Sequence, residues 1–304
     1  MASFFTDPSL RPALDEGFYS LKPDELAFFK TQTGISDPEE LKCHIIEVQK
    51  KAYEIYGYPC IRRFAFTILK ITQSLVYDRL VEMPRKYEGA IFLDIGCCFG
   101  TDIRKAVADG WSVENVIGSD LRKEFWEYGH DLFKSSPTSF PAAFVGGDAF
   151  ELISPRPPFY TEPETSRPNL QDLSSLTPLQ GHISAIHASF FFHLFSEEKQ
   201  SELACRVATL LSTTPGSFIF GSHLGLPEKG FRTAVDSKHC QYIMFCHSPE
   251  TWKELWDGQI FKKGSVRVDT KLDKLLRLRE DSPYTTASEK KVETYILSWS
   301  VTRI

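Results

Sequence analysis

The stretch 93–102, Leu-Asp-Ile-Gly-Cys-Cys-Phe-Gly-Thr-Asp, decides the fold that we expect for this chain. A short apolar run begins before it at Gly89, and the helix-like sequence 101–110 ends it. This order predicts a buried strand, a glycine turn and a helix. Gly96 and Gly100 let a ligand approach the backbone, and the first turn of the helix offers free N–H groups. We therefore expect a ligand site at this turn.

The same strand-then-helix unit recurs along the rest of the chain. Further apolar runs predict four more strands, at 113–121, 142–150, 183–192 and 216–224, and two helices, at 124–133 and 196–211. Such alternation is typical of a mostly parallel sheet with helices on both faces. The last two runs, 265–272 and 292–301, alternate apolar and polar residues without a helix between them, which favours antiparallel strands. The expected fold is an α/β fold with a Rossmann-like, seven-stranded sheet.

The sheet-forming domain is expected to span residues 88–304. Residues 1–87 precede the first strand, and helical spacing over 22–86 predicts a helical extension that covers the substrate. Six prolines across 154–180 predict an extended surface loop. Segment 224–257 concentrates large apolar side chains and is expected to act as a lid over the substrate.

Charge and cysteine usage narrow the class of protein. The chain has 35 Lys and Arg against 40 Asp and Glu, and the resulting net charge of -5 argues against a nucleic-acid partner. Seven cysteines without regular spacing indicate free thiols in a reducing, cytoplasmic compartment. No apolar stretch reaches the length of a membrane span, so no membrane partner is expected. These observations favour a small-molecule substrate and leave room for a homodimer.

Two further acidic residues follow predicted strands. Asp120 lies twenty residues past Gly100, where a carboxylate can accept two hydrogen bonds from ribose hydroxyls, and Asp148 follows the third strand. A nicotinamide dinucleotide is disfavoured because the turn reads G-x-x-x-G and lacks one glycine of the dinucleotide fingerprint. Each Asp taken singly can instead be a strand cap, an interpretation that is weaker for all three together.

Three acidic residues at successive strand ends, with an antiparallel end to the sheet, resemble the class I S-adenosylmethionine-dependent methyltransferases. The resemblance implies that Asp94 contacts the amino-acid end of S-adenosylmethionine, Asp120 the ribose and Asp148 the adenine N6. It implies that the cofactor-binding set is Asp94, Gly96, Cys97, Gly100, Asp120, Leu121, Asp148, Ala149 and His187. One departure is Cys98, which stands where the family usually has glycine, so the backbone approach to the ligand is expected to differ in detail.

Longer stretches resemble the fungal methyltransferases of meroterpenoid secondary metabolism. They are DIGCCFGTD, SDLRKEFWEYGHDLF, GGDAFEL, SFFFHLFSEEKQ, PGSFIFGSHLG and FCHSPETWKELW. The resemblance implies an O-methyltransferase acting on a polyketide-terpenoid or similar metabolite, with a carboxyl acceptor favoured. Hydroxyl O-methylation, N- or C-methylation, and a cofactor-binding regulatory module without catalysis stay open as alternatives.

The acceptor atom decides whether a base is needed. A carboxylate is already ionised at pH 7, whereas a hydroxyl needs its proton removed, most plausibly by histidine. His193 and His223 are the catalytic candidates, because both follow strands that end at the ligand edge. Arg62, Arg63 and Arg232 are candidates for pairing with an acceptor carboxylate. Zinc binding by His239, Cys240, Cys246 and His247 is disfavoured because adjacent ligands fit tetrahedral geometry poorly, so no metal is expected.

Overall fold

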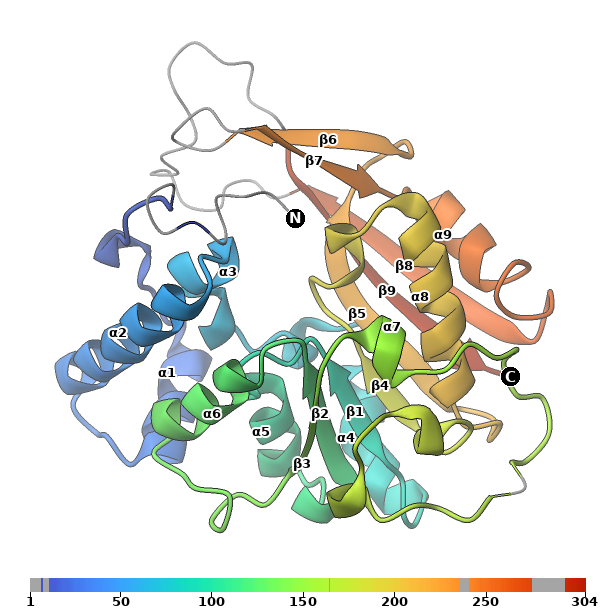
Figure 1. Cartoon of the computed structure of the whole chain (residues 1–304), viewed down its shortest axis with the longest axis horizontal. Coiled ribbons are helices and arrows are strands. Elements are labelled where there is room, and N and C mark those ends of the chain that lie inside the picture. The colour runs from blue at the N-terminus through green and yellow to red at the C-terminus, as the bar shows by residue number, and fades with distance from the viewer. Residues whose placement is uncertain (1–6, 8–10, 164, 236–240, 275–292) are drawn as a thin grey trace.

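The computed structural model describes residues 7, 11–163, 165–235, 241–274 and 293–304. A seven-stranded sheet with the order β3-β2-β1-β4-β5-β9-β8 runs through its centre (Figure 1). The expected α/β fold with antiparallel strands at the end of the chain is confirmed. The strands are β1 (Phe92–Ile95), β2 (Val116–Asp120), β3 (Ala143–Gly146), β4 (Ala185–His187), β5 (Phe218–Gly225), β8 (Val266–Lys274) and β9 (Tyr295–Arg303).

The first five strands are parallel, and their register places the candidate site residues next to one another. β1 pairs with β2 on one side and with β4 on the other, and Asp94 lies opposite both Gly118 and His187. Because parallel strands end at the same edge of a sheet, their carboxyl ends bring Asp94, Asp120 and His187 to one edge. β9 is antiparallel to both β5 and β8 and completes the sheet.

Helices cover both faces of the sheet. Phe92 packs with residues of α4 and α5 on one face, and Leu93 packs with residues of α8 and α9 on the other. This opposite placement of neighbouring residues follows from the two-residue period of a strand. The helices of the sheet domain are α4 (Tyr77–Lys86), α5 (Thr101–Ala108), α6 (Lys123–Leu132), α7 (Ala149–Leu152), α8 (Glu197–Leu210) and α9 (Pro249–Trp256).

The N-terminal helices α1 (Pro23–Thr33), α2 (Pro38–Ile55) and α3 (Pro59–Arg62) lie beside α6, far from β8 and α9 (Figure 1). Their apolar side chains share one buried cluster with Phe99, Phe125 and Phe133 of the sheet domain. His44 of α2 adds a 2.9 Å hydrogen bond between its Nε2 and the carbonyl oxygen of Leu132. The N-terminal extension therefore shares a hydrophobic core with the sheet domain.

Residues 61–80 do not form the helix that their apolar spacing predicts. The chain makes short 3₁₀ turns at Ala65–Thr67 and Ile71–Gln73, and Phe64 has a left-handed φ of 57°. Side chains from the start of α5 stabilise this irregular backbone by hydrogen bonds. Thr101 Oγ1 donates to the carbonyl oxygen of Phe66 at 2.7 Å, and Asp102 Oδ1 accepts the N–H of Ile71 at 3.0 Å. The apolar residues are therefore buried around turns instead of along one helix.

Segment 224–257 contains a hairpin that the sequence pattern did not reveal. β6 (Gly230–Val235) and β7 (Gln241–Cys246) form a separate antiparallel pair, drawn above the main sheet in Figure 1. Residues 236–240 between them, including His239 and Cys240, lie outside the described residues.

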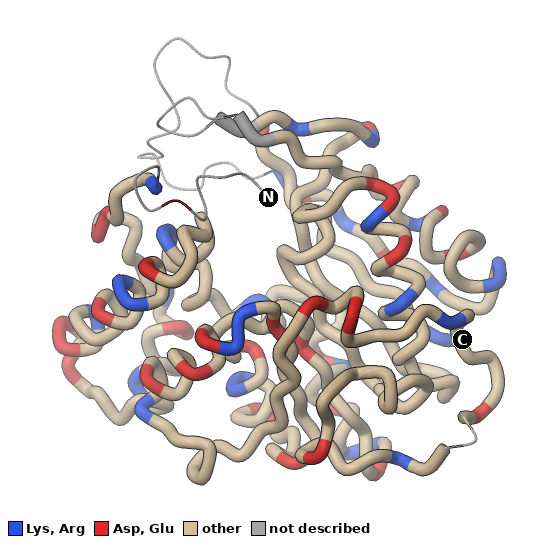
Figure 2. The backbone as a smooth tube through the Cα atoms, viewed as in Figure 1, with Lys and Arg blue, Asp and Glu red and all other residues tan. Residues whose placement is uncertain are grey.

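The surface of the described part of the chain carries charges of both signs. Lys and Arg are interspersed with Asp and Glu along the backbone shown in Figure 2. Within the described ranges, every helix is too short or too polar to cross a lipid bilayer.

Candidate functional site

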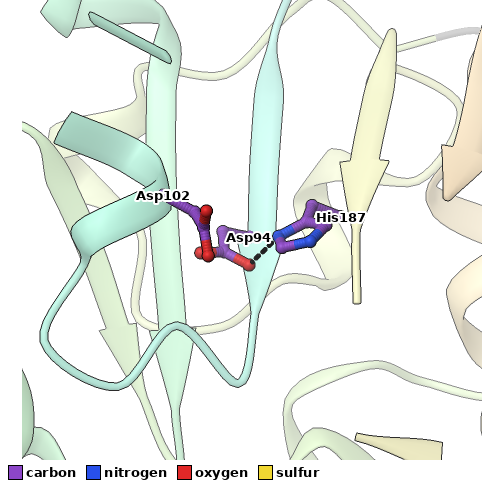
Figure 3. A group of neighbouring side chains, drawn as sticks. All are labelled: Asp94, Asp102 and His187. Atoms are coloured by element: carbon purple, nitrogen blue, oxygen red, sulfur yellow. Dashed lines mark hydrogen bonds and ion pairs between the residues drawn. The ribbon is translucent and has the colours of Figure 1, made fainter. Parts of the chain in front are cut away.

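Asp94 and His187 meet at the carboxyl edge of the sheet, where their side chains point toward each other (Figure 3). Nδ1 of His187 lies 2.8 Å from Oδ1 of Asp94, and Nε2 lies 2.6 Å from Oγ of Ser189. That hydroxyl also accepts the backbone N–H of Ser222 at 3.2 Å. Burial raises the pKa of Asp94, and the neighbouring imidazole of His187 opposes the rise. Both ring nitrogens of His187 are engaged, so the ring is held in one orientation.

A small pocket opens beside this hydrogen-bonded chain. Its wall is formed by the turn after β1, by His187 and Ser189, and by Phe66 and Lys70 of the N-terminal extension. Asp102 lies there too, almost fully buried, with its Oδ2 3.8 Å from Nζ of Lys70. The pocket therefore presents two buried carboxylates and one ammonium group. Neither Lys70 nor Asp102 was a sequence candidate. The position of Asp102 directly after the glycine turn could have indicated a site residue. No feature of the sequence around Lys70 indicates such a role.

Asp94, Asp102 and His187 have ligand atoms within 4.8 Å of one another, a spacing that could hold a metal ion. Their existing bonds argue against that use. Both nitrogens of His187 are already in hydrogen bonds, and Lys70 places a positive charge beside Asp102. A divalent ion would need a free lone pair on the imidazole. Two carboxylates with this surrounding are better suited to accept hydrogen bonds from an ammonium group.

The glycine turn has a left-handed backbone at three positions. The φ angles are 75° at Gly96, 51° at Cys98 and 69° at Gly100. A Cβ atom at Gly100 would lie 2.6 Å from the ring of Trp126, so this position has no room for a side chain. Cys98 adopts the conformation that glycine prefers, at a cost of about 1 kcal/mol. The sequence departure at Cys98 therefore leaves a glycine-like backbone in place.

Asp120 ties the end of β2 to this turn. Its Oδ2 accepts the backbone N–H of Cys98 at 2.9 Å, and its Oδ1 accepts that of Arg122 at 2.9 Å. Burial raises the pKa of Asp120 to about 6, although the two N–H groups favour the charged form. Each oxygen retains a second lone pair, so the carboxylate can still accept hydroxyl groups from a ligand.

Asp148, Ala149 and Leu121 lie outside the wall of the pocket around Asp94. Asp148 is exposed and caps α7, where its Oδ1 accepts the N–H of Phe150 at 2.9 Å. Ala149 is buried, whereas Leu121 exposes 44% of its surface directly after Asp120. The backbone N–H of Gly147 donates to the carbonyl oxygen of Asp120 at 3.0 Å, which ties the two strand ends together. An exposed cap and an exposed leucine at one edge leave both side chains accessible to a ligand.

Cys97 is buried beneath the turn, and its N–H donates to the carbonyl oxygen of Ser119 at 3.1 Å. Gly96 N–H donates to the same oxygen at 2.8 Å. The backbone of β2 therefore fixes the first half of the turn, while Asp120 fixes the second half through Cys98.

His193, His223 and His247 form a second group of buried polar residues, here called the histidine cluster. His193 lies in the 3₁₀ turn Phe192–Leu194 and not at the start of α8, His223 lies within β5, and His247 follows β7. Burial lowers the pKa of His193 and of His247 to about 4, and lowers that of His223 well below its ordinary value. His247 was not a candidate, because the hairpin that positions it was not predicted.

Each imidazole of the histidine cluster has one buried nitrogen without a hydrogen-bond partner in the described part of the chain: Nδ1 of His193, Nε2 of His223 and Nε2 of His247. Trp299 Nε1 donates to Nδ1 of His223 at 3.0 Å, so the unpartnered Nε2 of that ring carries its proton. These are neutral rings in aromatic surroundings.

The aromatic residues of segment 224–257 divide between core and surface. Trp252 and Trp256 are fully buried and pack against Phe192 and Trp299, so they belong to the core and do not offer a surface to a substrate. Phe231 of β6, in contrast, exposes 73% of its surface.

Comparisons with known proteins find fungal methyltransferases among the relatives of this chain. Residues 16–67 match the family described as "Meroterpenoid methyltransferase N-terminal domain". The "Asnovolin E/Chermesin D methyltransferase nvfJ" of Aspergillus novofumigatus is 30% identical over 264 residues, covering 87% of this chain and 83% of the relative. The "Methyltransferase ausD" of Aspergillus calidoustus is 27% identical over 77% of this chain and 75% of its own.

Among solved structures, an S-adenosylmethionine-dependent methyltransferase from Mesorhizobium loti aligns with a TM-score of 0.42 and 13% identity, over 76% of this chain and 99% of that chain. The degree and extent of identity to the Aspergillus novofumigatus protein are the finding that decides the family. The chain belongs to the family of S-adenosylmethionine-dependent methyltransferases that includes this fungal enzyme.

Proposed function

We propose that this enzyme transfers the methyl group of S-adenosylmethionine to a carboxylate of a polyketide-terpenoid metabolite and so forms a methyl ester. The acceptor class is supported by the match of residues 16–67 to a meroterpenoid methyltransferase domain and by the relative named for asnovolin E and chermesin D. The carboxyl acceptor is supported by the state of the histidine cluster.

That cluster offers no effective base. Burial holds the pKa of His193 and His247 at about 4 and that of His223 well below its ordinary value, far from the pKa of a phenol or alcohol. General-base catalysis is efficient only where the pKa of the base lies near the working pH. A carboxylate acceptor is ionised at pH 7 and needs no base. The neutral, buried histidines are the single observation on which the carboxyl assignment rests.

The reaction then needs positioning more than proton transfer. S-adenosylmethionine, when bound, supplies an electrophilic methyl group on a sulfonium sulfur. The bound cofactor would give this methyl group to an acceptor oxygen, the electron pair of the broken carbon–sulfur bond would stay on sulfur, and a carboxylate acceptor would have no proton to lose. Holding the two reacting atoms close and in line accounts for a large share of the rate in such displacements. The protein's part is to orient the acceptor and exclude water.

The pocket around Asp94 fits the methionine end of the cofactor. Asp94 and Asp102 are buried carboxylates that can accept hydrogen bonds from the α-ammonium group, and Lys70 can pair with the α-carboxylate. Burial, and to a smaller extent the nearby carboxylate of Asp102, raises the pKa of Asp94, and a bound ammonium group would favour the charged form of Asp94.

The remaining cofactor assignments complete this proposal. Asp120 accepts the ribose hydroxyls, Asp148 receives the adenine N6, and Leu121 and Ala149 contact the adenine faces. Gly96, Cys97 and Gly100 shape the turn, and His187 holds Asp94 in place.

Beyond the site, we propose the division into a cap at 1–87 and a catalytic domain at 88–304, with the loop at 154–180 on the surface. Segment 224–257 covers the acceptor through its hairpin. A cytoplasmic location and a homodimer are also proposed.

Methyl-labelled S-adenosylmethionine and an organic extract of fungal metabolites test the proposed acceptor. Products are separated, treated with mild alkali and assayed for labelled methanol. Release of the label as methanol identifies a methyl ester and hence a carboxylate acceptor. Label that resists alkali identifies an ether, N-methyl or C-methyl product and contradicts the carboxyl assignment. The Asp94→Ala variant is the control, because it should lose all labelling that depends on the bound cofactor.

A further inference from the structure

Arg232 on β6 is a half-buried cation close to the histidine cluster. It lies opposite Met244 in the hairpin, and its Nη2 donates to Oγ1 of Thr294 at 3.1 Å. Its Nε is buried and has no hydrogen-bond partner among the described residues. A guanidinium group carries five donors, and within the described ranges a neutral hydroxyl accepts from one of its nitrogens.

No carboxylate in the described part of the chain lies within ion-pair distance of Arg232. Its titratable neighbours are the neutral imidazole of His193 and the thiol of Cys246. Arg206, which is also half-buried, differs in this respect, because it bonds to Glu202 through Nε and Nη2. Burying an unpaired charge is costly, and the cost is recovered only when an anion arrives.

The location of Arg232 points to the acceptor side of the site. Ser189 lines the pocket around Asp94, and Phe190 follows it with a strained, left-handed φ of 53° and 39% of its surface exposed. The ring of Phe190 meets that of His193 edge to face at 5.9 Å, and the positive charge of Arg232 is near enough to lower the pKa of His193. Backbone strain of this kind persists where a side chain must be aimed at a functional space. The 3₁₀ turn Phe192–Leu194 contacts β7, the strand that pairs with β6, so the hairpin carries Arg232 to the turn that holds His193.

We propose that Arg232 receives the carboxylate of the methyl acceptor and selects acidic acceptors over their neutral counterparts. This inference rests on the proposed carboxyl methylation. The planar guanidinium can hold a carboxylate by two hydrogen bonds, which fixes its orientation while a lone pair on one oxygen stays available for attack. Arg232 acts here as a specificity-determining residue and takes no part in proton transfer.

Another arginine considered from the sequence, Arg62, has a different surrounding. Its Nε donates to the carbonyl oxygen of Ala13 at 2.7 Å, and its guanidinium lies over the ring of Phe18. It helps to fasten the start of the chain to the N-terminal helices. Arg232 is therefore the better candidate for a ligand contact.

A matched pair of probes tests the assignment: 3-farnesyl-4-hydroxybenzoic acid and its primary amide. Binding of each is measured by calorimetry with S-adenosylhomocysteine present. One charge-assisted contact predicts that the wild-type protein binds the acid at least about 10-fold more tightly than the amide. Arg232→Gln should reduce this preference to less than about 2-fold, and Arg232→Lys should keep part of it. Arg267→Gln, which alters an exposed arginine paired with Asp269, is the control and should keep the full preference.

The affinity for S-adenosylhomocysteine should stay within about 2-fold in all three variants, because Arg232 does not line the cofactor pocket. Acid preference that survives in Arg232→Gln, or that is missing in the wild-type protein, overturns the assignment. So does failure of the wild-type protein to bind either probe. The probe also carries a phenol, so alkali-stable labelling of it would contradict the proposed function itself. Ester formation with unchanged preference in Arg232→Gln would contradict the role of Arg232 alone.

A second readout checks the geometry without any acceptor. Arg232 lowers the pKa of His193, so Arg232→Gln should raise the pKa of that imidazole in an NMR titration. An unchanged His193 titration would show that the two side chains are not neighbours in solution.

Discussion

The pocket around Asp94 and the histidine cluster are both buried, but they hold opposite kinds of polar group. In the pocket, His187 is hydrogen-bonded to Asp94 and to Ser189, and Asp102 accepts the backbone N–H of Ile71. In the histidine cluster, the rings are neutral, and each has a nitrogen that finds no hydrogen-bond partner in the described ranges. The proposed function assigns different roles to the two regions: the carboxylates of the pocket hold the charged cofactor, and the histidine cluster takes no proton from the acceptor.

In the pocket around Asp94, loss of Asp94 itself should cause the largest decrease in cofactor affinity. Asp94→Ala removes one buried carboxylate and leaves His187 without its partner. Truncating one member of a buried charged pair typically costs about 2 to 5 kcal/mol, so affinity for S-adenosylhomocysteine should fall at least about 100-fold by calorimetry. Asp148→Ala, which alters an exposed cap, should lose no more than about 10-fold. Equal losses in the two variants would mean that burial does not distinguish the two carboxylates.

Protonation of Asp120 should make cofactor affinity depend on pH. Its pKa is raised to about 6, and we expect its ionised form to accept the ribose hydroxyls. As pH falls below 6 the carboxylate takes up a proton that must leave on binding, so affinity should fall by about 10-fold per unit. Above pH 7 affinity should be constant. Asp120→Asn should bind about 10- to 100-fold more weakly at pH 7.5 and remove the part of the pH dependence that this carboxylate causes. Parallel pH profiles for variant and wild type would place the titrating group elsewhere.

In the histidine cluster, removal of the His193 imidazole should lower the reaction rate only modestly. With a carboxylate acceptor, His193→Ala should lower kcat by less than about 10-fold through positioning, and leave the pH–rate profile between pH 6 and 9 unchanged. Steady-state kinetics with the ester-forming acceptor measure both. A loss of kcat of about 10² to 10⁴-fold that is restored by raising the pH would identify His193 as a general base. The histidine cluster would then take part in proton transfer, contrary to the proposed function.

The smallest effect concerns the turn itself. Cys98→Gly relieves a left-handed residue but loses a half-buried thiol, so the free energy of unfolding should change by less than about 1 kcal/mol. Cys97→Gly, at the buried neighbour, should destabilise the protein by about 1 to 2 kcal/mol. Urea denaturation of both variants checks the pair. A strongly destabilised Cys98→Gly would show that the thiol, and not the backbone shape, matters at this position.

The cofactor edge was largely predictable because its information is local. A strand, a glycine turn and a helix occupy one short stretch, and acids at the ends of parallel strands must meet at one edge. The hydrogen bond from Cys98 to Asp120 joins two such predicted points. The division of segment 224–257 was not predictable in the same way. Trp252 and Phe231 are both large and apolar, and only packing decides that one is buried and the other exposed.

The succession of strands and helices along residues 88–224, and the position of Asp94, Asp120 and His187 at strand ends, could be predicted from the sequence. The reason is that hydrophobic period and strand ends are properties of neighbouring residues. Only the tertiary structure decided that Lys70 enters the pocket and that Arg232 lies beside His193. Lys70 is placed by hydrogen bonds that reach back from Thr101 and Asp102 and break the expected helix. Such contacts join distant parts of the chain, so no local pattern records them.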